Sequence, residues 1–262
     1  MDIVNSSLPD ASPLRRTALV TGASRGIGRA IACALAADGW NLILTCSRSL
    51  SALNALANEL ENTHKDSGLR VRSVCCDAKD PAAVRTLFRE IPHLELLVNN
   101  AGIAHIGLLQ DVTDEEWNCV LQTNLSSVFY TSREAIPLFL RSRSEDSAAC
   151  PGRILNISSV WGSAGASCEA AYSASKGGVN ALTRALAKEL APSGIPVNAL
   201  ACGCVETQMN HLLSADDRAA LAEEIPAGRF ADPEEIAAAV VQLAHMPAYL
   251  TGQIITMDGG WI

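Results

Sequence analysis

Short apolar runs alternate with longer helical segments over almost the whole chain, and this alternation restricts the fold more than any other feature. Strands that alternate with helices form a parallel sheet with helices on both faces. The sequence therefore predicts an α/β fold, a single Rossmann-type doubly wound domain of about seven strands over residues 17–262. The expected strands are residues 17–20, 41–46, 70–76, 95–98, 153–157, 195–201 and 253–256.

Helical patterns fill the segments between these strands. A long one begins at Asp114, the expected N-cap, and runs with a break to Leu140, where Pro137 is expected to kink or shorten the last turn. The segment from Arg141 to Pro151 is rich in serine and charge, which favours a surface loop. The other expected helices are residues 29–36, 50–61, a segment that begins at Pro81, one that carries Tyr172 and ends near residue 190, 214–225 and 233–244.

The first residues and the net charge limit the location and the partners. Residues 1–16 are polar, contain two prolines and lack the apolar centre of a signal peptide, so we expect a disordered leader. No apolar stretch approaches the roughly 20 residues of a membrane helix. A net charge of −8 disfavours nonspecific binding of nucleic acid, which requires a basic surface. We expect a cytoplasmic protein with no membrane or nucleic-acid partner.

The nine cysteines do not form a disulfide or metal pattern. Their number is odd, and most fall within apolar helix or strand patterns, where a free cysteine packs as a small hydrophobic residue. Neither Cys75-Cys76 nor Cys202-x-Cys204 has the spacing of a zinc site or a nearby histidine. We therefore expect no metal.

A glycine-rich turn follows the first expected strand and leads directly into a helix. In this context glycines allow backbone N–H groups to approach a pyrophosphate, and the helix N-terminus adds a favourable dipole. The alternative is a tight turn without a ligand. The residues expected to hold phosphates are Gly22, Ser24, Arg25, Gly26, Ile27 and Gly28.

Tyr172 and Lys176 are four residues apart in an expected helix, and Ser159 precedes them by thirteen residues. Residues at this spacing share one face of a helix, so the phenol and the ammonium would lie side by side. A nearby cation favours the phenolate and lowers the pKa of a phenol. A hydroxyl from Ser159 could then hold a carbonyl oxygen while Tyr172 donates a proton to it.

Several polar or small residues are expected at the carboxyl ends of neighbouring strands. In a doubly wound sheet, ligands bind beyond these ends. The sequence therefore predicts one site at this edge of the sheet, assembled from Gly22, Asp77, Asn99, Ser159 and Gly203.

These motifs, in this order and at these separations, resemble the short-chain dehydrogenase/reductase family over nearly the whole chain. Within that family the sequence is most similar to bacterial 3-oxoacyl-carrier-protein reductases. The runs that carry the resemblance are Thr21–Gly28, Asn99–Gly102, Asn124-Leu125, Asn156–Ser159, Tyr172–Lys176, Thr251–Gln253 and Asp258–Gly260.

The resemblance implies hydride transfer between a nicotinamide and a carbonyl or alcohol carbon. Ser159 would bind the carbonyl oxygen, Tyr172 would protonate it, and Lys176 would lower the pKa of the phenol and bind the nicotinamide ribose. Asn124 would hold a water in a proton relay to Lys176. Further cofactor contacts implied by the resemblance are Asp77 and Ala78 at the adenine, Asn99, Ala101 and Gly102 at the ribose, and Gly203, Val205 and Thr207 at the nicotinamide.

The end of the second strand bears on the choice between NADP and NAD. Enzymes that prefer NAD usually carry an acidic residue there, which binds the adenosine ribose hydroxyls. This chain has Cys46-Ser47-Arg48, so a 2′-phosphate would meet no repulsion, and Arg25 and Arg48 could bind it. We expect NADP, with NAD as the alternative.

The sequence says less about the substrate than about the fold or the cofactor. Trp161, Cys168 and Met209 are expected to line the pocket, and residues 206–229 to form a lid over it. His105 is the one histidine expected near the substrate, with a place in a surface loop as the alternative. The family pattern has Pro-Gly where this chain has Cys202-Gly203, which could make that loop more mobile.

One further feature separates this chain from the carrier-protein reductases. The arginine with which these enzymes often dock their acidic partner is missing at the end of the tyrosine-bearing helix, which reads Ala191–Gly194. The alternatives are a dehydrogenase of a sugar, polyol or steroid, or a nucleotide sensor without turnover. The resemblance also implies a homotetramer.

Overall fold

In the computed structural model, residues 16–145, 151–210 and 214–262 are described, and they form one layered domain. The predicted leader, apart from Arg16, lies outside the described residues. Residues 146–150 of the predicted loop also lie outside them. Seven parallel strands form one sheet in the order β3-β2-β1-β4-β5-β6-β7. The strands are β1 Thr17–Val20, β2 Asn41–Cys46, β3 Val71–Cys75, β4 Leu96–Asn99, β5 Arg153–Ser159, β6 Val197–Cys202 and β7 Ile254–Met257. The sequence-based prediction of the fold class is confirmed.

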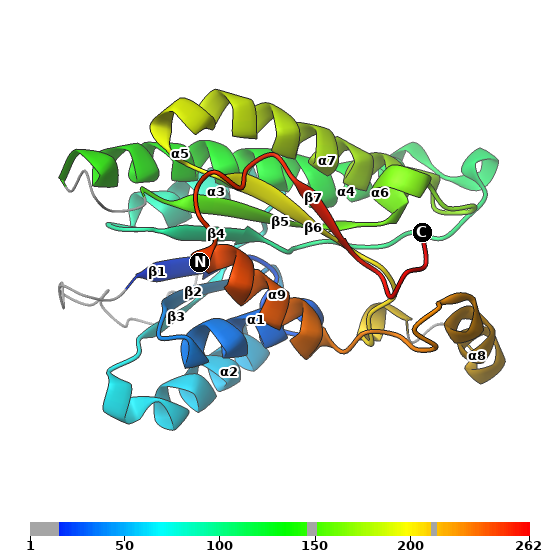
Figure 1. The fold of residues 1–262 in the computed structure, drawn as a ribbon, viewed down its shortest axis with the longest axis horizontal. Helices are drawn as coiled ribbons and strands as arrows, with labels where there is room; N and C mark the ends of the chain where they lie inside the picture. The colour runs from blue at the N-terminus through cyan, green and yellow to red at the C-terminus, as the bar shows by residue number, and fades with distance from the viewer. Residues whose placement is uncertain (1–15, 146–150, 211–213) are drawn as a thin grey trace.

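Helices cover both faces of the sheet (Figure 1). Helices α1 (Gly26–Ala37), α2 (Leu50–Thr63) and α9 (Pro233–His245) lie on one side. On the other side are α3 (Pro81–Arg89), α4 (Asp114–Leu121), α5 (Ser127–Glu145) and α7 (Ala170–Leu190). Two shorter helices are α6 (Trp161–Ala164) and α8 (Ala215–Glu224).

Each side of the sheet has its own hydrophobic core. One core includes Leu35 of α1 and Val240 of α9, and both side chains are fully buried. The other core includes Phe139 of α5 and Ile154 of β5, which are also fully buried. Burial on both faces explains why the strands read as continuous apolar runs rather than as alternating patterns.

The long predicted helix differs from its prediction in three ways. Thr113, not Asp114, is the N-cap, because its hydroxyl accepts the Glu116 N–H while Glu116 bonds back to the Thr113 N–H. The expected break is a turn of π-helix at Gln122–Ser126. Helix α5 continues to Glu145 with Pro137 inside it, so residues 141–145 of the predicted loop are helical.

The site predicted at the edge of the sheet has a structural basis in the strand order. Strands β1 and β4 are neighbours although two strands separate them in the sequence, so the chain leaves in opposite directions on either side of this pair. A crevice at such a reversal is the usual ligand position in a doubly wound sheet. Asn99 and Ser159 are the last residues of β4 and β5, rather than the first residues after them.

Candidate active site

Ser159 and Tyr172 contact each other at the carboxyl edge of the sheet. Ser159 ends β5, and Tyr172 lies in the first turn of α7, the helix that follows β5 and α6 in the chain. The Ser159 hydroxyl lies close enough to the phenol of Tyr172 to lower its pKa, and the Ser159 oxygen accepts the N–H of Trp161 at 3.2 Å. Two hydroxyls in contact at this edge can hold one substrate oxygen between them.

Lys176 lies beneath Tyr172 and is almost completely buried. Its Nζ atom is 5.6 Å from the centre of the Tyr172 ring and donates a hydrogen bond of 2.9 Å to the main-chain oxygen of Ile157. Burial lowers the pKa of Lys176 from its ordinary 10.5 to about 8, because a desolvated ammonium is unfavourable. The expected side-by-side arrangement of phenol and ammonium is therefore present.

The pKa of Tyr172 differs in direction from the sequence-based expectation. Burial raises it above the ordinary value of 10.0, and the hydrogen bond from Ser159 lowers it by less. The charges of Cys202 and Glu169 raise it further. The expected lowering of this pKa does not occur, because desolvation of the phenolate outweighs the other contributions.

Asn124 lies at the centre of the π-turn, and its amide is engaged by protein atoms. Its Oδ1 atom accepts the N–H of Ile103 at 2.8 Å, and its Nδ2 atom donates to the Ile103 oxygen at 2.9 Å and to Ser175 Oγ at 3.0 Å. The side chain thus joins the segment after β4 to α7 at Ser175, the residue that precedes Lys176. A π-turn inside a helix often marks a functional site.

The glycine-rich segment is held in a conformation that brings its backbone close to neighbouring main chain. Gly22 has φ +66°, and a Cβ atom there would lie 2.9 Å from the Cα of Ala101. A Cβ on Gly28 would lie 2.3 Å from the Gly22 oxygen. Asn100 Nδ2 donates to the oxygens of Thr21 and Gly22 at 2.9 and 3.1 Å. A side chain at either glycine would collide with these neighbours, so the tight turn requires glycine, and it leads into the N-terminus of α1, where a pyrophosphate could bind.

Asn99 and Asn100 stabilise the structure around the sheet, and the ribose contact expected for this run stays a prediction. The Asn99 side chain is buried, donating to Asn156 Oδ1 at 2.9 Å and accepting from Thr131 at 2.6 Å. It ties β4 to β5 and α5. Asn100, which the sequence analysis did not single out as a site residue, positions the glycine-rich segment through the bonds described above.

The segment after β6 closes onto the glycine-rich segment. Thr207 lies 3.5 Å from the position of a Cβ on Gly26, and Arg25 donates to Gln208 Oε1 at 3.1 Å. Gly203 donates its N–H to Met257 at 2.9 Å, and Val205 pairs with Ala231. The residues expected at the nicotinamide and those expected at the pyrophosphate thus lie at the same edge of the sheet.

The end of β2, where the adenosine ribose is expected to bind, carries no acidic residue. Cys46 is buried, and Ser47 and Arg48 are exposed. Among the described residues, none forms a hydrogen bond or ion pair with the Arg48 side chain. Glu59 is engaged by Arg29 at 2.8 Å. Asp77, with Oδ1 accepting the Lys79 N–H at 3.2 Å, and the buried Ala78 follow β3 at the same edge.

The expected pocket residues lie in the segments that follow β5 and β6. The ring of Trp161 packs against that of Trp261 with 4.8 Å between centroids, so the C-terminal residues contact this segment. Cys168 has φ +62°, and its oxygen accepts the Gly107 N–H at 2.8 Å. Met209 is 46% exposed. The predicted lid contains α8, and residues 211–213 within it lie outside the described residues.

His105 bonds away from the two hydroxyls, and the sequence analysis missed two residues near the site, Trp261 and Glu169. The Nε2 atom of His105 lies 3.3 Å from Glu116 Oε1, so its partner is the cap of α4 rather than Ser159 or Tyr172. Trp261 and Glu169 were missed because neither belongs to a motif. Glu169 precedes Tyr172 by three residues, which was the available signal.

A model of the short chain dehydrogenase family matches residues 16–218. The chain belongs to this family. It is an oxidoreductase that acts on CH–OH or C=O groups and uses a nicotinamide cofactor. The 3-oxoacyl-[acyl-carrier-protein] reductase FabG of Escherichia coli is 40% identical over 250 residues, covering 94% of this chain and 96% of that protein. The uncharacterised oxidoreductase YmfI of Bacillus subtilis is 39% identical, covering 95% and 99%.

A solved structure shows the same fold. A dehydrogenase/reductase from Sinorhizobium meliloti aligns with a TM-score of 0.83 at 33% identity, covering 95% of this chain and 96% of that one.

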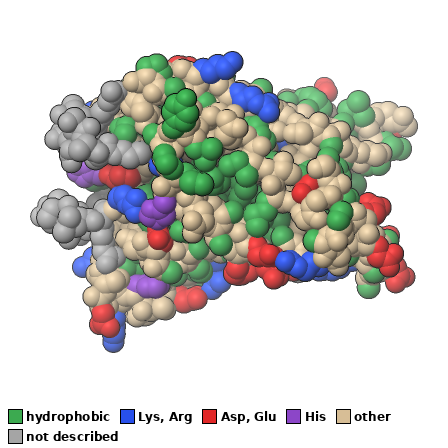
Figure 2. Space-filling view, viewed as in Figure 1, with side chains coloured by type: hydrophobic (Ala, Val, Ile, Leu, Met, Phe, Trp, Pro, Cys, Tyr) green, Lys and Arg blue, Asp and Glu red, His purple; other side chains and the backbone are tan. Residues whose placement is uncertain are grey.

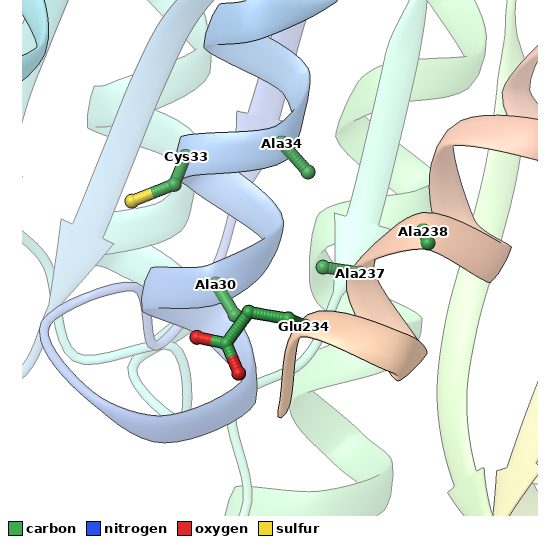
Figure 3. Close-up of a pocket in the computed structure, with 6 residues that line it drawn as sticks. All are labelled: Ala30, Cys33, Ala34, Glu234, Ala237 and Ala238. Carbon is green, nitrogen blue, oxygen red and sulfur yellow. The ribbon is translucent and has the colours of Figure 1, made fainter. Parts of the chain in front are cut away.

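A hollow of about 310 Å³ lies on the outer side of the molecule between α1 and α9 (Figure 3). Figure 3 shows the methyl groups of Ala34 and Ala237 in the gap between the two helices and the Glu234 carboxylate near Ala30. Small side chains allow these helices to pack closely, and the hollow is separate from Ser159 and Tyr172. No group of three or more potential metal ligands occurs in the described part of the chain, and no helix there is long and apolar enough to span a membrane.

Proposed function

We propose that this oxidoreductase reduces a ketone to a secondary alcohol with NADPH and catalyses the reverse reaction with NADP. The observation that carries the proposal is the contact between the Ser159 and Tyr172 hydroxyls above the buried Lys176 ammonium. The bound nicotinamide would supply or accept the hydride. The protein would supply the position of the substrate and the proton.

Each of these side chains has a role that follows from its chemistry. Ser159 would donate a hydrogen bond to the carbonyl oxygen, and Tyr172 would give its proton to that oxygen during reduction. Because burial keeps the phenol protonated at neutral pH, Tyr172 is suited to act as an acid. Lys176 would bind the nicotinamide ribose. Asn124 would hold the segment after β4 in place and complete the route by which a proton reaches Lys176.

The cofactor site favours NADP over NAD. The glycine-rich segment and the N-terminus of α1 would hold the pyrophosphate through backbone N–H groups. The exposed guanidinium of Arg48 at the end of β2 would bind a 2′-phosphate, with Arg25 nearby on the glycine-rich segment. Asp77 and Ala78 would contact the adenine, Ala101 and Gly102 the ribose, and Gly203, Val205 and Thr207 the carboxamide.

Two substrate classes fit this reaction. The first is a 3-oxoacyl thioester, which the similarity to FabG supports. The second is a sugar, polyol or steroid, supported by the acidic net charge of −8 and by the absence of an arginine at residues 191–194. A solved structure of a candidate gluconate dehydrogenase from Agrobacterium tumefaciens, 32% identical with a TM-score of 0.85 and covering 94% of this chain and 95% of that one, agrees with the second class. A nucleotide sensor without turnover has no support from the comparisons.

We also propose a homotetramer and a cytoplasmic location. Exposed apolar side chains flank the last strand and lie on α5, and they would be covered in an assembly: Met246, Tyr249, Ile262, Phe129 and Leu140. Figure 2 shows hydrophobic side chains gathered in the middle of the face that carries α9 and β7. The described cysteines are all free thiols, the state that a reducing compartment maintains.

The experiment is a spectrophotometric screen of the purified protein. NADPH and NADH oxidation would be followed with 3-oxoacyl thioesters, hydroxy ketones, ketoses and ketosteroids. We expect turnover with one of these classes and a higher kcat/KM with NADPH. If no carbonyl is reduced, or if NADH is used equally well, the corresponding part of the proposal is wrong.

A further inference from the structure

Two cysteines lie side by side at the carboxyl ends of neighbouring strands. Cys46 is the last residue of β2, Cys75 is the last residue of β3, and the two are register partners in this parallel pair. The N–H of Cys76 donates to the main-chain oxygen of Cys46 at 2.8 Å, which holds the two strand ends together. Register partners in neighbouring strands lie about 4.8 Å apart, within the range of roughly 4.4–6.8 Å between Cα atoms that a disulfide requires.

Both thiols lie on the same face of the sheet. Cys46 belongs to the core that contains Leu35 of α1. Val74 and Cys76, on either side of Cys75 in the sequence, belong to the core on the opposite face. Because side chains alternate along a strand, Cys75 lies on the face of Cys46. Burial raises the pKa of Cys46, and the neighbouring Cys75 thiol raises it further. Cys76 lies on the other face, so it does not compete for Cys46.

Cys75 is the thiol of this pair that an oxidant can reach. Strand β3 is an edge strand of the sheet (Figure 1), and Cys75 is half-buried, whereas Cys46 is 4% exposed. The susceptibility of a thiol to oxidation increases with its exposure. Cys75 would therefore react first, and the buried Cys46 thiol would react with the oxidised sulfur of Cys75.

The pair adjoins the segment expected to bind the adenosine end of the cofactor. The Cys75 thiol donates a hydrogen bond of 3.6 Å to the main-chain oxygen of Ser47, and Arg48 is the next residue. A sulfur atom in a disulfide carries no proton, so a bond between Cys46 and Cys75 would remove this hydrogen bond. The segment that presents the Arg48 guanidinium would then lose a contact that holds it.

We propose that Cys46 and Cys75 form a reversible redox pair, and that its oxidation to a disulfide weakens the binding of NADPH. The effect on NADPH rests on the proposed cofactor site, whereas the formation of the disulfide does not. In a reducing compartment such a disulfide is transient, as a regulatory bond must be.

A peroxide is the oxidant in this reaction. The Cys75 thiolate attacks one oxygen and breaks the O–O bond, which gives a sulfenic acid and a hydroxide that takes up the proton lost by Cys75. The Cys46 thiol then attacks the Cys75 sulfur, and the sulfenic hydroxyl leaves as water with the Cys46 proton. The two thiols lose two electrons and two protons, and one hydrogen peroxide becomes two waters. A dithiol restores both thiols by exchange and is itself oxidised to a disulfide.

The test measures the disulfide and the cofactor affinity separately. Wild type, Cys75→Ser and the control Cys119→Ser would be treated with hydrogen peroxide, which catalase then removes, and measured before and after addition of dithiothreitol. The hydroxyl of Cys75→Ser can still donate to Ser47 but cannot form the disulfide. Cys119 is a half-buried thiol of α4, on the other side of the sheet. Mass spectrometry of peptides alkylated in denaturant identifies the linked cysteines, and calorimetry gives the affinities for NADPH and NADH.

We expect peroxide to link Cys46 to Cys75 in wild type and in Cys119→Ser, and to lower their affinity for NADPH by about tenfold, the effect of losing one hydrogen bond to a charged group. The affinity for NADH should change by less than about threefold, because NADH has no 2′-phosphate, whereas a general loss of structure would weaken both cofactors alike. Dithiothreitol should reverse the change, and Cys75→Ser should show neither effect.

Two results overturn the proposal. The first is peroxide-treated wild type without a link between Cys46 and Cys75, and the second is a link that leaves the affinity for NADPH unchanged. If the reduced wild-type protein binds no NADPH, the proposed cofactor is wrong, and the linked peptides alone then decide whether the two thiols form a redox pair.

Discussion

The ammonium of Lys176 donates a hydrogen bond to the main-chain oxygen of Ile157, at 2.9 Å, rather than to the phenol of Tyr172. This contact joins α7 to the middle of β5 and places a cation beneath Tyr172. Burial of that cation is unfavourable, and it lowers the pKa of Lys176 to about 8. The position of Lys176 therefore opposes the stability of the fold near neutral pH.

Replacing Lys176 by methionine should stabilise the cofactor-free protein while it removes activity. A lysine with a lowered pKa destabilises the fold below about pH 8, and this effect disappears as the pH rises toward the ordinary 10.5. After subtraction of the lost bond to Ile157, Lys176→Met should raise the free energy of unfolding at pH 7 by about 2 kcal/mol. Urea unfolding of both proteins at pH 7 and pH 10 measures the difference in the free energy of unfolding and its dependence on pH. A variant that is less stable than wild type at pH 7 contradicts the assignment.

Removing the amide of Asn124 should have the opposite effect on stability. Its side chain is 1% exposed and forms three hydrogen bonds that link Ile103 and Ser175. Asn124→Ala leaves buried backbone groups of Ile103 without partners and should lower the free energy of unfolding by about 3 kcal/mol. Asn118→Ala, on the outward side of α4, is the control. Unchanged thermal unfolding of Asn124→Ala would show that water replaces these bonds.

Arg48 should decide the preference between the two cofactors. Its guanidinium is exposed at the end of β2, and Arg48→Ala should weaken NADPH binding by about tenfold and leave NADH binding nearly unchanged. Isothermal titration calorimetry gives both dissociation constants. Arg85→Ala, an exposed arginine of α3, should change neither. Equal affinities of the wild-type protein for NADPH and NADH would contradict this role.

Cys202 should be chemically inert in the folded protein. It replaces the proline of the family pattern, is 4% exposed, and has a pKa that burial raises to about 12. Its alkylation by iodoacetamide at pH 8 should be about a thousandfold slower than that of an ordinary thiol. Mass spectrometry of the native protein, with half-exposed Cys75 as the internal comparison, measures this. Rapid labelling of Cys202 would show that the segment after β6 opens.

The fold could be predicted because strand and helix patterns are local. Every predicted strand is present with bounds that differ by at most a few residues, since each lies in a buried apolar run. The errors occur where local patterns compete. The charged and serine-rich run after Leu140 reads as a loop, yet α5 continues through it to Glu145. Thr113 and Asp114 both cap helices well, and only the reciprocal bond with Glu116 distinguishes them.

The sequence predicted which residues meet in the candidate site, but not the direction in which the pKa of Tyr172 is shifted. Spacing and motifs placed Ser159, Tyr172 and Lys176 together, and the structure brings them together. Burial, which no motif encodes, raises the pKa of Tyr172 where the sequence suggested a lower value. The contribution of Trp261 depends on the path of the chain after β7, and that of Glu169 depends on the loop before α7.

The most direct test of the account is the effect of Tyr172→Phe on turnover and on cofactor binding. Phenylalanine keeps the ring above Lys176 and removes the hydroxyl that contacts Ser159. We expect kcat for ketone reduction to fall by about a thousandfold or more, with NADPH affinity by calorimetry changed by less than about threefold. Near-normal turnover in Tyr172→Phe would show that another group donates the proton and would contradict the central claim.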